Sequence, residues 1–292
     1  MIRLLITALL AIALTAAPAA AKVTAVVGIM PVKYFVEQIG GQDVEVTALV
    51  EAGADPHTYE PKPSQMRTIA KADALFAIGI GLEKNWIPRF KSANPNLRVF
   101  PLDNGVSKVP MQAHAHDEAE VHHEGHGHQG LDPHIWTSPL LVKQVAGNIL
   151  AGLVEIDPGN EAAYRRNHNA FVGRVDALHQ EIQKTLAGVP EHAEFMVYHP
   201  AWGYFARTYH LVQIPVESEG KAPGPRQLGE LIEHAREHHI KVIFVQPQLS
   251  ERSARTIAEA IDGQVVKADP LAYDWPENLL RVAETFRKAL VK

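Results

Sequence analysis

A short stretch of the chain, from His114 to His134, concentrates residue types that bind metal ions. It holds seven of the sixteen histidines, interleaved with aspartate and glutamate. Imidazole is the commonest protein ligand for metals near neutral pH, and histidine-rich tracts are typical of metal-binding segments. Because no apolar periodicity runs through it, the stretch from about 111 to 130 is predicted to be a disordered loop. Its candidate metal ligands are His114, His116, His122, His123, His126 and His128.

This loop has a simpler interpretation as a solvated linker without a function. Six imidazoles within fifteen residues of an acidic, glycine-containing segment nevertheless bind transition metals whatever their origin. Metal binding by the loop is therefore expected, and its biological role is a separate question.

Three histidines outside the loop each stand directly beside a proline. The pairs are Pro56–His57, Pro133–His134 and His199–Pro200. Proline fixes its own φ angle and restricts the residue before it, so the backbone at each histidine is constrained before any ligand arrives. Constrained histidines are better suited to a permanent binding site than those of a mobile loop.

The rest of the chain alternates between predicted strands and helices. Short apolar, β-branched runs indicate strands, and segments with a 3.6-residue apolar period indicate helices. Strands are predicted at 23–29, 44–50, 74–80, 97–101, 194–198, 211–216, 241–245 and 264–267. Helices are predicted at 32–39, 64–72, 138–155, 157–187, 201–209, 227–239, 250–261 and 277–291. This alternation predicts an α/β fold with parallel-type sheets and helices on both faces.

The chain has 292 residues, which is too long for one small core and fits two domains of ordinary size. We predict an N-terminal α/β domain at 22–156, a linking helix at 157–188 and a C-terminal α/β domain at 189–292. The linking helix has proline only at its start, so it can run unbroken for roughly 45 Å and act as a spine.

Four potential metal ligands fall at the carboxyl ends of predicted strands, where ligands bind in open α/β sheets. His57 lies in the loop after the second strand, and His134 lies in the connection after the fourth. His199 directly follows the first strand of the second half, and Asp269 lies two residues beyond the last strand. Two ligands from each half are therefore expected to meet at one edge.

Three neutral imidazoles and one carboxylate form a four-coordinate shell that suits Zn²⁺. A complete shell leaves no open position for a catalytic water, which favours carrying the ion over using it in catalysis. Each residue also has an ordinary interpretation, the histidines as loop or strand-end residues and Asp269 as part of a turn with Asp274 nearby. Their shared placement favours the metal site.

One rival motif reads His234-Ala-Arg-Glu-His238, which matches the H-x-x-E-H pattern of inverse zinc metalloproteases. On a helical wheel Glu237 points away from the apolar face, so a solvated amphipathic helix is the favoured interpretation. That apolar face is predicted to contain Leu228, Leu231, Ile232, Ala235 and His239.

The first 21 residues have the features of a cleaved signal peptide: a charged start, a short apolar run and an Ala-rich end. No Cys follows to carry a lipid, so we expect a periplasmic protein, and no other stretch is expected to span a membrane. The absence of Cys also excludes disulfides and thiolate ligands. The formal net charge of −5 argues against a nucleic-acid partner.

Several motifs occur in an order that resembles a known protein family. They are GADPHTYEPKPS, the His-rich loop, LDPHIW, DPGNEAAYRRNHNAF, MVYHPAWGYFA, EGKAPGPRQL and ADPLA. Over essentially all of 22–292 the chain resembles the periplasmic zinc-binding proteins of ABC uptake transporters, in the zinc/manganese solute-binding cluster. The resemblance implies two (β/α) domains joined by a rigid backbone helix, with one metal in the cleft between them.

The resemblance also implies a ligand set. The three histidines of the family fall on His57, His134 and His199, and the carboxylate of manganese members and some zinc members falls on Asp269. Certain zinc members have Glu directly before the first histidine, but Pro56 stands there in this chain, which gives Asp269 more weight. Histidine at position 199, where manganese members typically have Glu, favours zinc.

We therefore expect a monomeric periplasmic receptor, not an enzyme, that captures Zn²⁺ and hands it to an inner-membrane ABC permease. A periplasmic zinc metallochaperone is a further candidate partner, and the His-rich loop would gather zinc near the cleft. Three alternatives stay open: a manganese-specific member of the same family, a periplasmic zinc buffer or chaperone without a permease, and a zinc hydrolase with an exchangeable fourth ligand.

Overall fold

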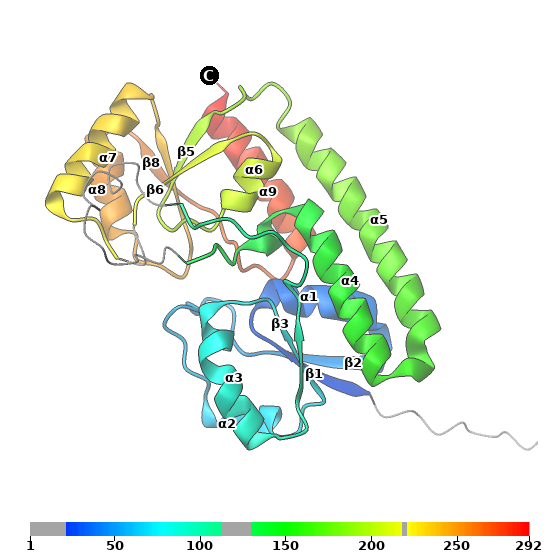
Figure 1. The fold of residues 1–292 in the computed structure, drawn as a ribbon. Helices are drawn as coiled ribbons and strands as arrows, with labels where there is room; N and C mark the ends of the chain where they lie inside the picture. Colours follow the sequence, from blue (N-terminus) through cyan, green and yellow to red (C-terminus); the bar gives the residue numbers. More distant parts are fainter. Residues whose placement is uncertain (1–21, 113–129, 218–220, 292) are drawn as a thin grey trace, which may run out of the picture.

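The computed structural model describes residues 22–112, 130–217 and 221–291. The predicted signal peptide and the six loop histidines from His114 to His128 lie outside these residues. Each half of the described chain contains a four-stranded parallel sheet with flanking helices (Figure 1). The predicted α/β fold with parallel-type sheets is confirmed.

The N-terminal sheet has the strand order β2-β1-β3-β4, and every neighbouring pair is parallel. Its strands are β1 (Val23–Val27), β2 (Val44–Ala48), β3 (Ala74–Ala77) and β4 (Arg98–Pro101). The helices of this half are α1 (Met30–Gly40), α2 (Pro63–Ile69) and α3 (Gly81–Ala93). All four residues of β3 are buried, as expected for a parallel strand covered on both faces.

The C-terminal sheet repeats this arrangement, with the order β6-β5-β7-β8. Its strands are β5 (Glu194–Val197), β6 (Val212–Pro215), β7 (Val242–Val245) and β8 (Gln264–Lys267). Its helices are α6 (Gly203–Thr208), α7 (Pro225–Glu237) and α8 (Arg252–Ala260). In both sheets the strand order reverses beside the first strand of the half, and such switch points are where α/β sheets form binding crevices.

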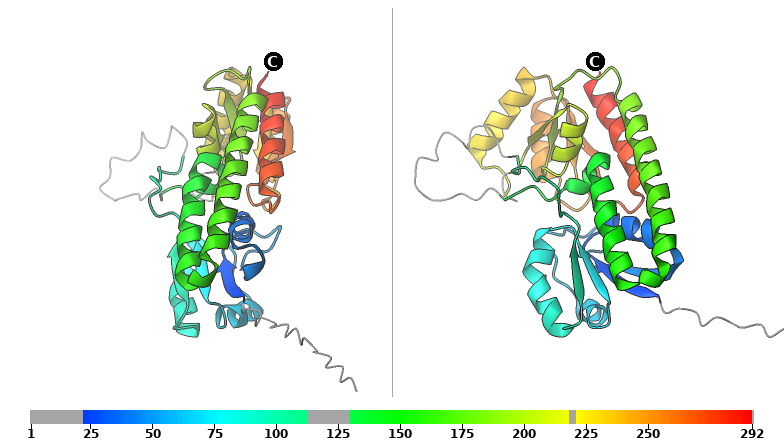
Figure 2. Two further views of the ribbon diagram at one scale, coloured as in Figure 1. Left: turned by 90° about the vertical axis from the view of Figure 1, so that its right-hand side faces the viewer. Right: turned by 45° about the vertical axis from the view of Figure 1, so that its right-hand side comes forward.

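Three further helices connect the halves: α4 (Pro139–Ile156), α5 (Glu161–Thr185) and α9 (Trp275–Leu290). The 25 residues of α5 span about 37 Å and pack against α1 and α4 at one end and α9 at the other (Figures 1 and 2). Its buried face consists of Tyr164, Phe171, Val175, Leu178 and Ile182. Helix α5 is thus placed to act as the proposed linking helix.

Helix α4 is long and apolar enough to cross a membrane by length and composition, which the sequence-based prediction overlooked. In the fold it packs against α1, α5 and β4. Its side chains that point into the core include Val142, Val145, Ile149 and Leu153, all fully buried. The apolar composition of α4 is therefore explained by its place between the N-terminal sheet and α5.

Two local predictions differ from the structure. Helix α3 is absent from the prediction, and it contains Pro88 in its interior, a residue that removes one helical hydrogen bond. The helix predicted at 64–72 begins one residue earlier, with Lys62 as the N-cap and Pro63 in the first turn. The side chain of Gln65 completes this start by accepting a hydrogen bond of 2.9 Å from the Lys62 backbone N–H.

Candidate metal centre

Three of the four predicted ligands lie together between the two halves of the molecule. His57 comes from the loop after β2, His134 from the segment before α4, and His199 from the end of β5. One ring nitrogen of each lies within 4.8 Å of the others. Segments far apart in the sequence therefore meet at a common point because parallel strands present their carboxyl ends at the same edge of each sheet.

His134 is held in position by a buried carboxylate two residues earlier. Its backbone N–H donates to Asp132 Oδ1 over 2.9 Å, and its ring Nδ1–H donates to the same oxygen over 2.7 Å. The Tyr204 hydroxyl donates to the backbone carbonyl of Asp132 over 2.9 Å, which fixes the backbone at this residue. A proton on Nδ1 leaves a lone pair on Nε2 for a metal.

His199 is oriented by a second buried carboxylate. Its Nδ1–H donates to Glu217 Oε1, and both side chains are about 95% buried. The backbone N–H of Glu217 donates to the carbonyl of Tyr198 over 3.0 Å, which holds the end of β6 beside the end of β5. Nε2 of His199 is therefore also free to bind a metal.

His57 is the exposed member of the group. Its loop is closed by Asp55, whose Oδ1 accepts the His57 backbone N–H over 2.9 Å and whose Oδ2 accepts the Thr58 hydroxyl over 3.1 Å. This is the local turn that aspartate commonly forms with the backbone two residues on. His57 thus closes the site on its solvent side.

The spacing of the three nitrogens matches ligands around one ion. Nε2 of His199 lies 3.2 Å from Nε2 of His57 and 3.3 Å from Nε2 of His134. In a tetrahedral zinc site with Zn–N bonds of about 2.0–2.1 Å, ligand nitrogens lie about 3.3–3.4 Å apart. Carboxylates hold the proton on Nδ1 of two rings, so the facing Nε2 atoms present lone pairs that a cation would satisfy.

The electrostatic environment favours neutral imidazoles and a bound cation. Desolvation lowers the pKa of His199, opposed by its hydrogen bond to Glu217. Desolvation and the neighbouring His199 also lower the pKa of His57. Neutral rings have the free lone pair that metal binding needs. The carboxylates of Asp132 and Glu217 lie directly behind the rings and balance the charge of a dication.

Asp269, the fourth predicted ligand, lies outside the group. Among the residues that the structure describes, those sharing this centre within 4.8 Å are the three histidines. Asp269 Oδ1 accepts hydrogen bonds of 2.9 Å from Gln248 Nε2 and from the Leu271 backbone N–H.

The cavity beside the histidines has a volume of about 30 Å³. It is lined by Pro56, His57, Ile80, Gly81, Pro133, His134, Trp136, Gln246, Pro270 and Leu271. A water needs roughly 10–15 Å³ of such space, so the cavity has room for an ion with one or two waters.

Sequence reasoning missed the two carboxylates that orient the rings, although both carried a signal. Asp132 precedes His134 by two residues in the motif LDPHIW, a spacing at which a side chain can bond the following backbone. Glu217 directly follows the predicted strand 211–216, so the sheet-edge rule that selected the histidines also applies to it.

The rival metalloprotease motif lies on α7 and at its end. Glu237 is exposed, as the helical wheel predicts. The expectation that His239 belongs to the apolar face is wrong: it is exposed and follows the helix with a φ of 55°. This left-handed backbone ends the helix and turns His239 away from the core.

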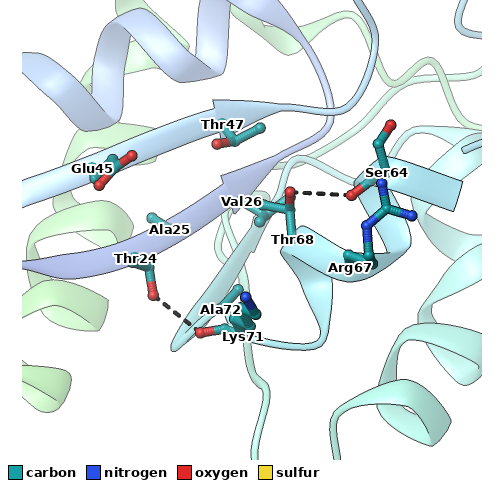
Figure 3. A pocket seen from close by; sticks show the side chains of 10 residues that line it. All are labelled: Thr24, Ala25, Val26, Glu45, Thr47, Ser64, Arg67, Thr68, Lys71 and Ala72. Atoms are coloured by element: carbon teal, nitrogen blue, oxygen red, sulfur yellow. Dashed lines mark hydrogen bonds between the residues drawn. The ribbon is translucent and has the colours of Figure 1, made fainter. Parts of the chain in front are cut away.

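A different cavity, of about 320 Å³, lies where β1 and β2 face α2 (Figure 3). Hydroxyl groups dominate its polar lining, and the Thr24 and Thr68 hydroxyls donate to the carbonyls of Lys71 and Ser64. Its lining residues are Thr24, Ala25, Val26, Glu45, Thr47, Ser64, Arg67, Thr68, Lys71 and Ala72. No histidine is among them, so this cavity is unrelated to the metal centre.

Comparison with known proteins yields a consistent result. The pattern of one family, the periplasmic component A of the zinc-uptake complex (ZnuA), matches residues 25–289. The high-affinity zinc uptake system protein ZnuA of Bacillus subtilis (strain 168) is 31% identical over 235 residues, which cover 79% of this chain and 73% of that protein.

Two further similarities extend this result. The zinc-binding protein AdcA of Streptococcus pyogenes serotype M3 is 28% identical over 264 residues, 86% of this chain and 50% of that protein, so the chain spans half its length. A crystal structure of ZnuA superposes with a TM-score of 0.84 at 39% identity, over 92% of this chain and 99% of that one. The arrangement of two sheets is thus that of a known fold.

Proposed function

Because the chain belongs to the family of the periplasmic zinc-uptake complex component A, we propose that it is the zinc-binding component of an ABC importer. It captures Zn²⁺ in the periplasm and delivers the ion to an inner-membrane permease. The two relatives are a zinc uptake system protein and a zinc-binding protein, which supports zinc as the cargo.

The observation that carries this proposal is the spacing of the three Nε2 atoms, 3.2 and 3.3 Å, with two of the rings backed by buried carboxylates. Carboxylate–histidine–metal arrangements of this kind fix the ring orientation and raise the basicity of the ligand. We infer that His57, His134 and His199 bind the transported ion.

The fourth coordination position is adjacent to the segment that contains Asp269. Pro270 and Leu271 line the small cavity beside the histidines. Asp269 Oδ1 is held by Gln248 and by the Leu271 backbone N–H, so these hydrogen bonds would have to break or rearrange for the carboxylate to bind the ion. We keep Asp269 as the proposed fourth ligand, with the histidines as the main determinants of affinity.

A carrier role is favoured over hydrolysis by the size of the site. Zinc hydrolases need an exchangeable water and a place for substrate next to it. The cavity beside the histidines, of about 30 Å³, matches the size of an ion with one or two waters. The family is also one of transport components.

A manganese carrier is the second candidate, and the three imidazole nitrogens of the site make it less favoured than a zinc carrier. Manganese prefers carboxylate and carbonyl oxygens, whereas imidazole nitrogens suit zinc and copper. All three side chains of the group are histidines. Zinc is therefore the proposed cargo, and a titration with Mn²⁺ should show far weaker binding.

Export as a periplasmic protein through the predicted signal peptide, and zinc gathering by the loop from about 111 to 130, complete the proposal. Both segments lie largely outside the described residues. If the loop raises the local zinc concentration, its deletion slows zinc loading when zinc is scarce. Unchanged loading would identify it as a linker. A metallochaperone as donor and a monomeric state are further parts of this proposal.

A zinc titration tests the ligand assignment. In competition with a chromogenic chelator, the change His134→Ala should lower the zinc affinity by more than about 100-fold, because loss of a ligand exceeds the 10- to 100-fold typical of losing its hydrogen-bond partner. The control His168→Ala, on α5, should leave it unchanged. Retention of tight binding by His134→Ala would refute the assignment.

Growth under zinc limitation tests the transport role. Deletion of the gene should impair growth at low zinc, and the wild-type chain, but not His134→Ala, should restore it. A zinc buffer without a permease would share every ligand and yet leave zinc import unaffected. Normal import in the deletion strain would therefore favour the buffer.

A further inference from the structure

A second group of metal-binding side chains lies at the opposite edge of the C-terminal sheet. It consists of Glu194, His234 and His238, whose ligand atoms lie within 4.8 Å of one another. Glu194 is the first residue of β5, and His199 lies five residues further along. Five extended residues span about 16 Å, so this group is distinct from the three-histidine centre.

The two histidines face one carboxylate oxygen. His234 Nε2 and His238 Nδ1 each lie 2.9 Å from Glu194 Oε2. The rings are stacked, with centroids 4.2 Å apart and planes within 15° of parallel. This stacking holds both nitrogens on the same side of the helix. Ligand atoms of a tetrahedral zinc site lie about 3.3–3.4 Å apart, so shifts of a few tenths of an ångström would admit an ion.

The position on the helix favours a cation. His234 and His238 are separated by four residues, the spacing that places two side chains on one helical face. His234 belongs to the last turn of α7, and His238 is its C-cap. The C-terminal end of a helix carries a partial negative charge, which stabilises a positive ion.

The group is accessible to a hydrated ion. The side chains of Glu194, His234 and His238 are 23%, 32% and 45% exposed. Glu194 and His238 also line a cavity of about 740 Å³, together with His192 and Lys241. The Lys241 ammonium donates to the carbonyl of Ile261, so it is engaged away from the two rings. Water from the cavity can complete the coordination of an ion.

We propose that Glu194, His234 and His238 form a second, weaker site for a divalent transition-metal ion such as Zn²⁺, on the side of the domain opposite the transport site. Two imidazoles and a carboxylate suit zinc, nickel and copper better than magnesium or calcium. The site is weaker because its ligands are partly exposed and, in the described part of the chain, neither ring is backed by a buried carboxylate. In the absence of metal the same contacts are hydrogen bonds from both rings to Glu194.

Metal stoichiometry tests this site in the full mature chain. Equilibrium dialysis against increasing free Zn²⁺ measures the zinc bound per chain. In the weaker phase of binding, His234→Ala/His238→Ala should bind one equivalent of zinc fewer than wild type. The tight phase should be unchanged. His168→Ala is the matched control for removal of a histidine, and Glu194→Gln should weaken the same phase. Equal zinc uptake by the double variant and wild type at every concentration would overturn the proposal.

A site-resolved measurement separates this group from the loop histidines. With ¹⁵N-histidine labelling, the ring signals of His234 and His238 are assigned from their loss in the single variants His234→Gln and His238→Gln, which keep a polar side chain. Both signals should shift together as Zn²⁺ is added. Ring signals that do not change with zinc would contradict the proposal and show that Glu194, His234 and His238 form only a hydrogen-bonded group. Because the tight phase reports on the transport site, failure here leaves the proposed function untouched.

Discussion

Among the individual residues of the candidate metal centre, two buried carboxylates orient histidines that would bind the ion. Asp132 and Glu217 each accept the Nδ1–H of a histidine. This fixes the tautomer, so that Nε2 of His134 and of His199 point at the same place. His57 has no such partner among the described contacts and relies on its Asp55 turn. We therefore expect the two buried histidines to contribute more to affinity than His57.

The change Glu217→Gln tests the role of one orienting carboxylate. The amide keeps the shape but removes the negative charge behind His199, so zinc affinity should fall by about 10- to 100-fold. Chelator competition measures this change. Glu259→Gln, on the exposed side of α8, is the control and should bind zinc as wild type does. Equal affinities in both variants would show that Glu217 only supports the fold.

The lowered pKa of His199 predicts a pH dependence of stability in the zinc-free protein. An unfolded histidine has a pKa of about 6.5, whereas burial lowers the pKa of His199 in the fold. The unfolded state thus binds more protons below about pH 6.5, and the free energy of unfolding should fall as the pH drops through that value. Denaturant unfolding at pH 7.5 and 5.5 should show a smaller fall in the free energy of unfolding for His199→Asn than for wild type. An equal fall would assign the effect to other groups.

At the scale of elements, the close approach of α4 to the N-terminal sheet requires glycine at one position. A Cβ at Gly152 would lie 2.7 Å from the ring of Phe76 and 3.0 Å from that of Phe100. These rings stack on each other, with centroids 5.3 Å apart, so neither can move freely. Gly147, on the same helix, has open space where its Cβ would be.

A pair of matched substitutions tests this packing. Both Gly152→Ala and Gly147→Ala gain helix propensity of up to about 1 kcal/mol. Only Gly152→Ala overpacks the core, at a cost of about 1–3 kcal/mol. Gly152→Ala should therefore unfold at a lower temperature than Gly147→Ala, measured by circular dichroism. Equal midpoints would mean that α4 can shift away from the sheet.

At the scale of the whole molecule, the two halves share a core. The largest cluster of buried apolar residues includes side chains from both sheets and from α5 and α9. The rings of Phe35 on α1 and Trp275 on α9 lie 4.9 Å apart, and the Trp136 indole N–H donates to the carbonyl of Pro270 over 2.7 Å. Such continuous packing between the halves limits hinge opening.

Bound zinc should stabilise the whole molecule, because its ligands come from both halves. At a free zinc concentration 100-fold above the dissociation constant, the gain in unfolding free energy is about 2.7 kcal/mol. The melting temperature should therefore rise with zinc, fall after chelation, and rise much less in His199→Ala. A zinc-dependent rise of the same size in that variant would place the stabilising site elsewhere.

Sequence patterns alone predict the class of fold and the three histidines that meet in the candidate site. A buried strand and an amphipathic helix have different apolar repeats, so the two can be told apart in the sequence. Their alternation along the chain predicted parallel sheets. Strand ends followed by His57, His134 and His199 predicted where ligands gather. Helix α3 escaped prediction because Pro88 interrupts its pattern, although the surrounding fold tolerates it.

The folded structure is needed to show which side chains share a centre and which partners orient them. Distances between residues more than sixty positions apart depend on how two sheets pack through α5, and a one-dimensional pattern does not contain that packing. The same holds for Glu194, which lies beside His234 and His238 only because β5 begins at the C-terminal end of α7. Local periodicity reports burial, whereas a binding site depends on contacts that the folded chain creates.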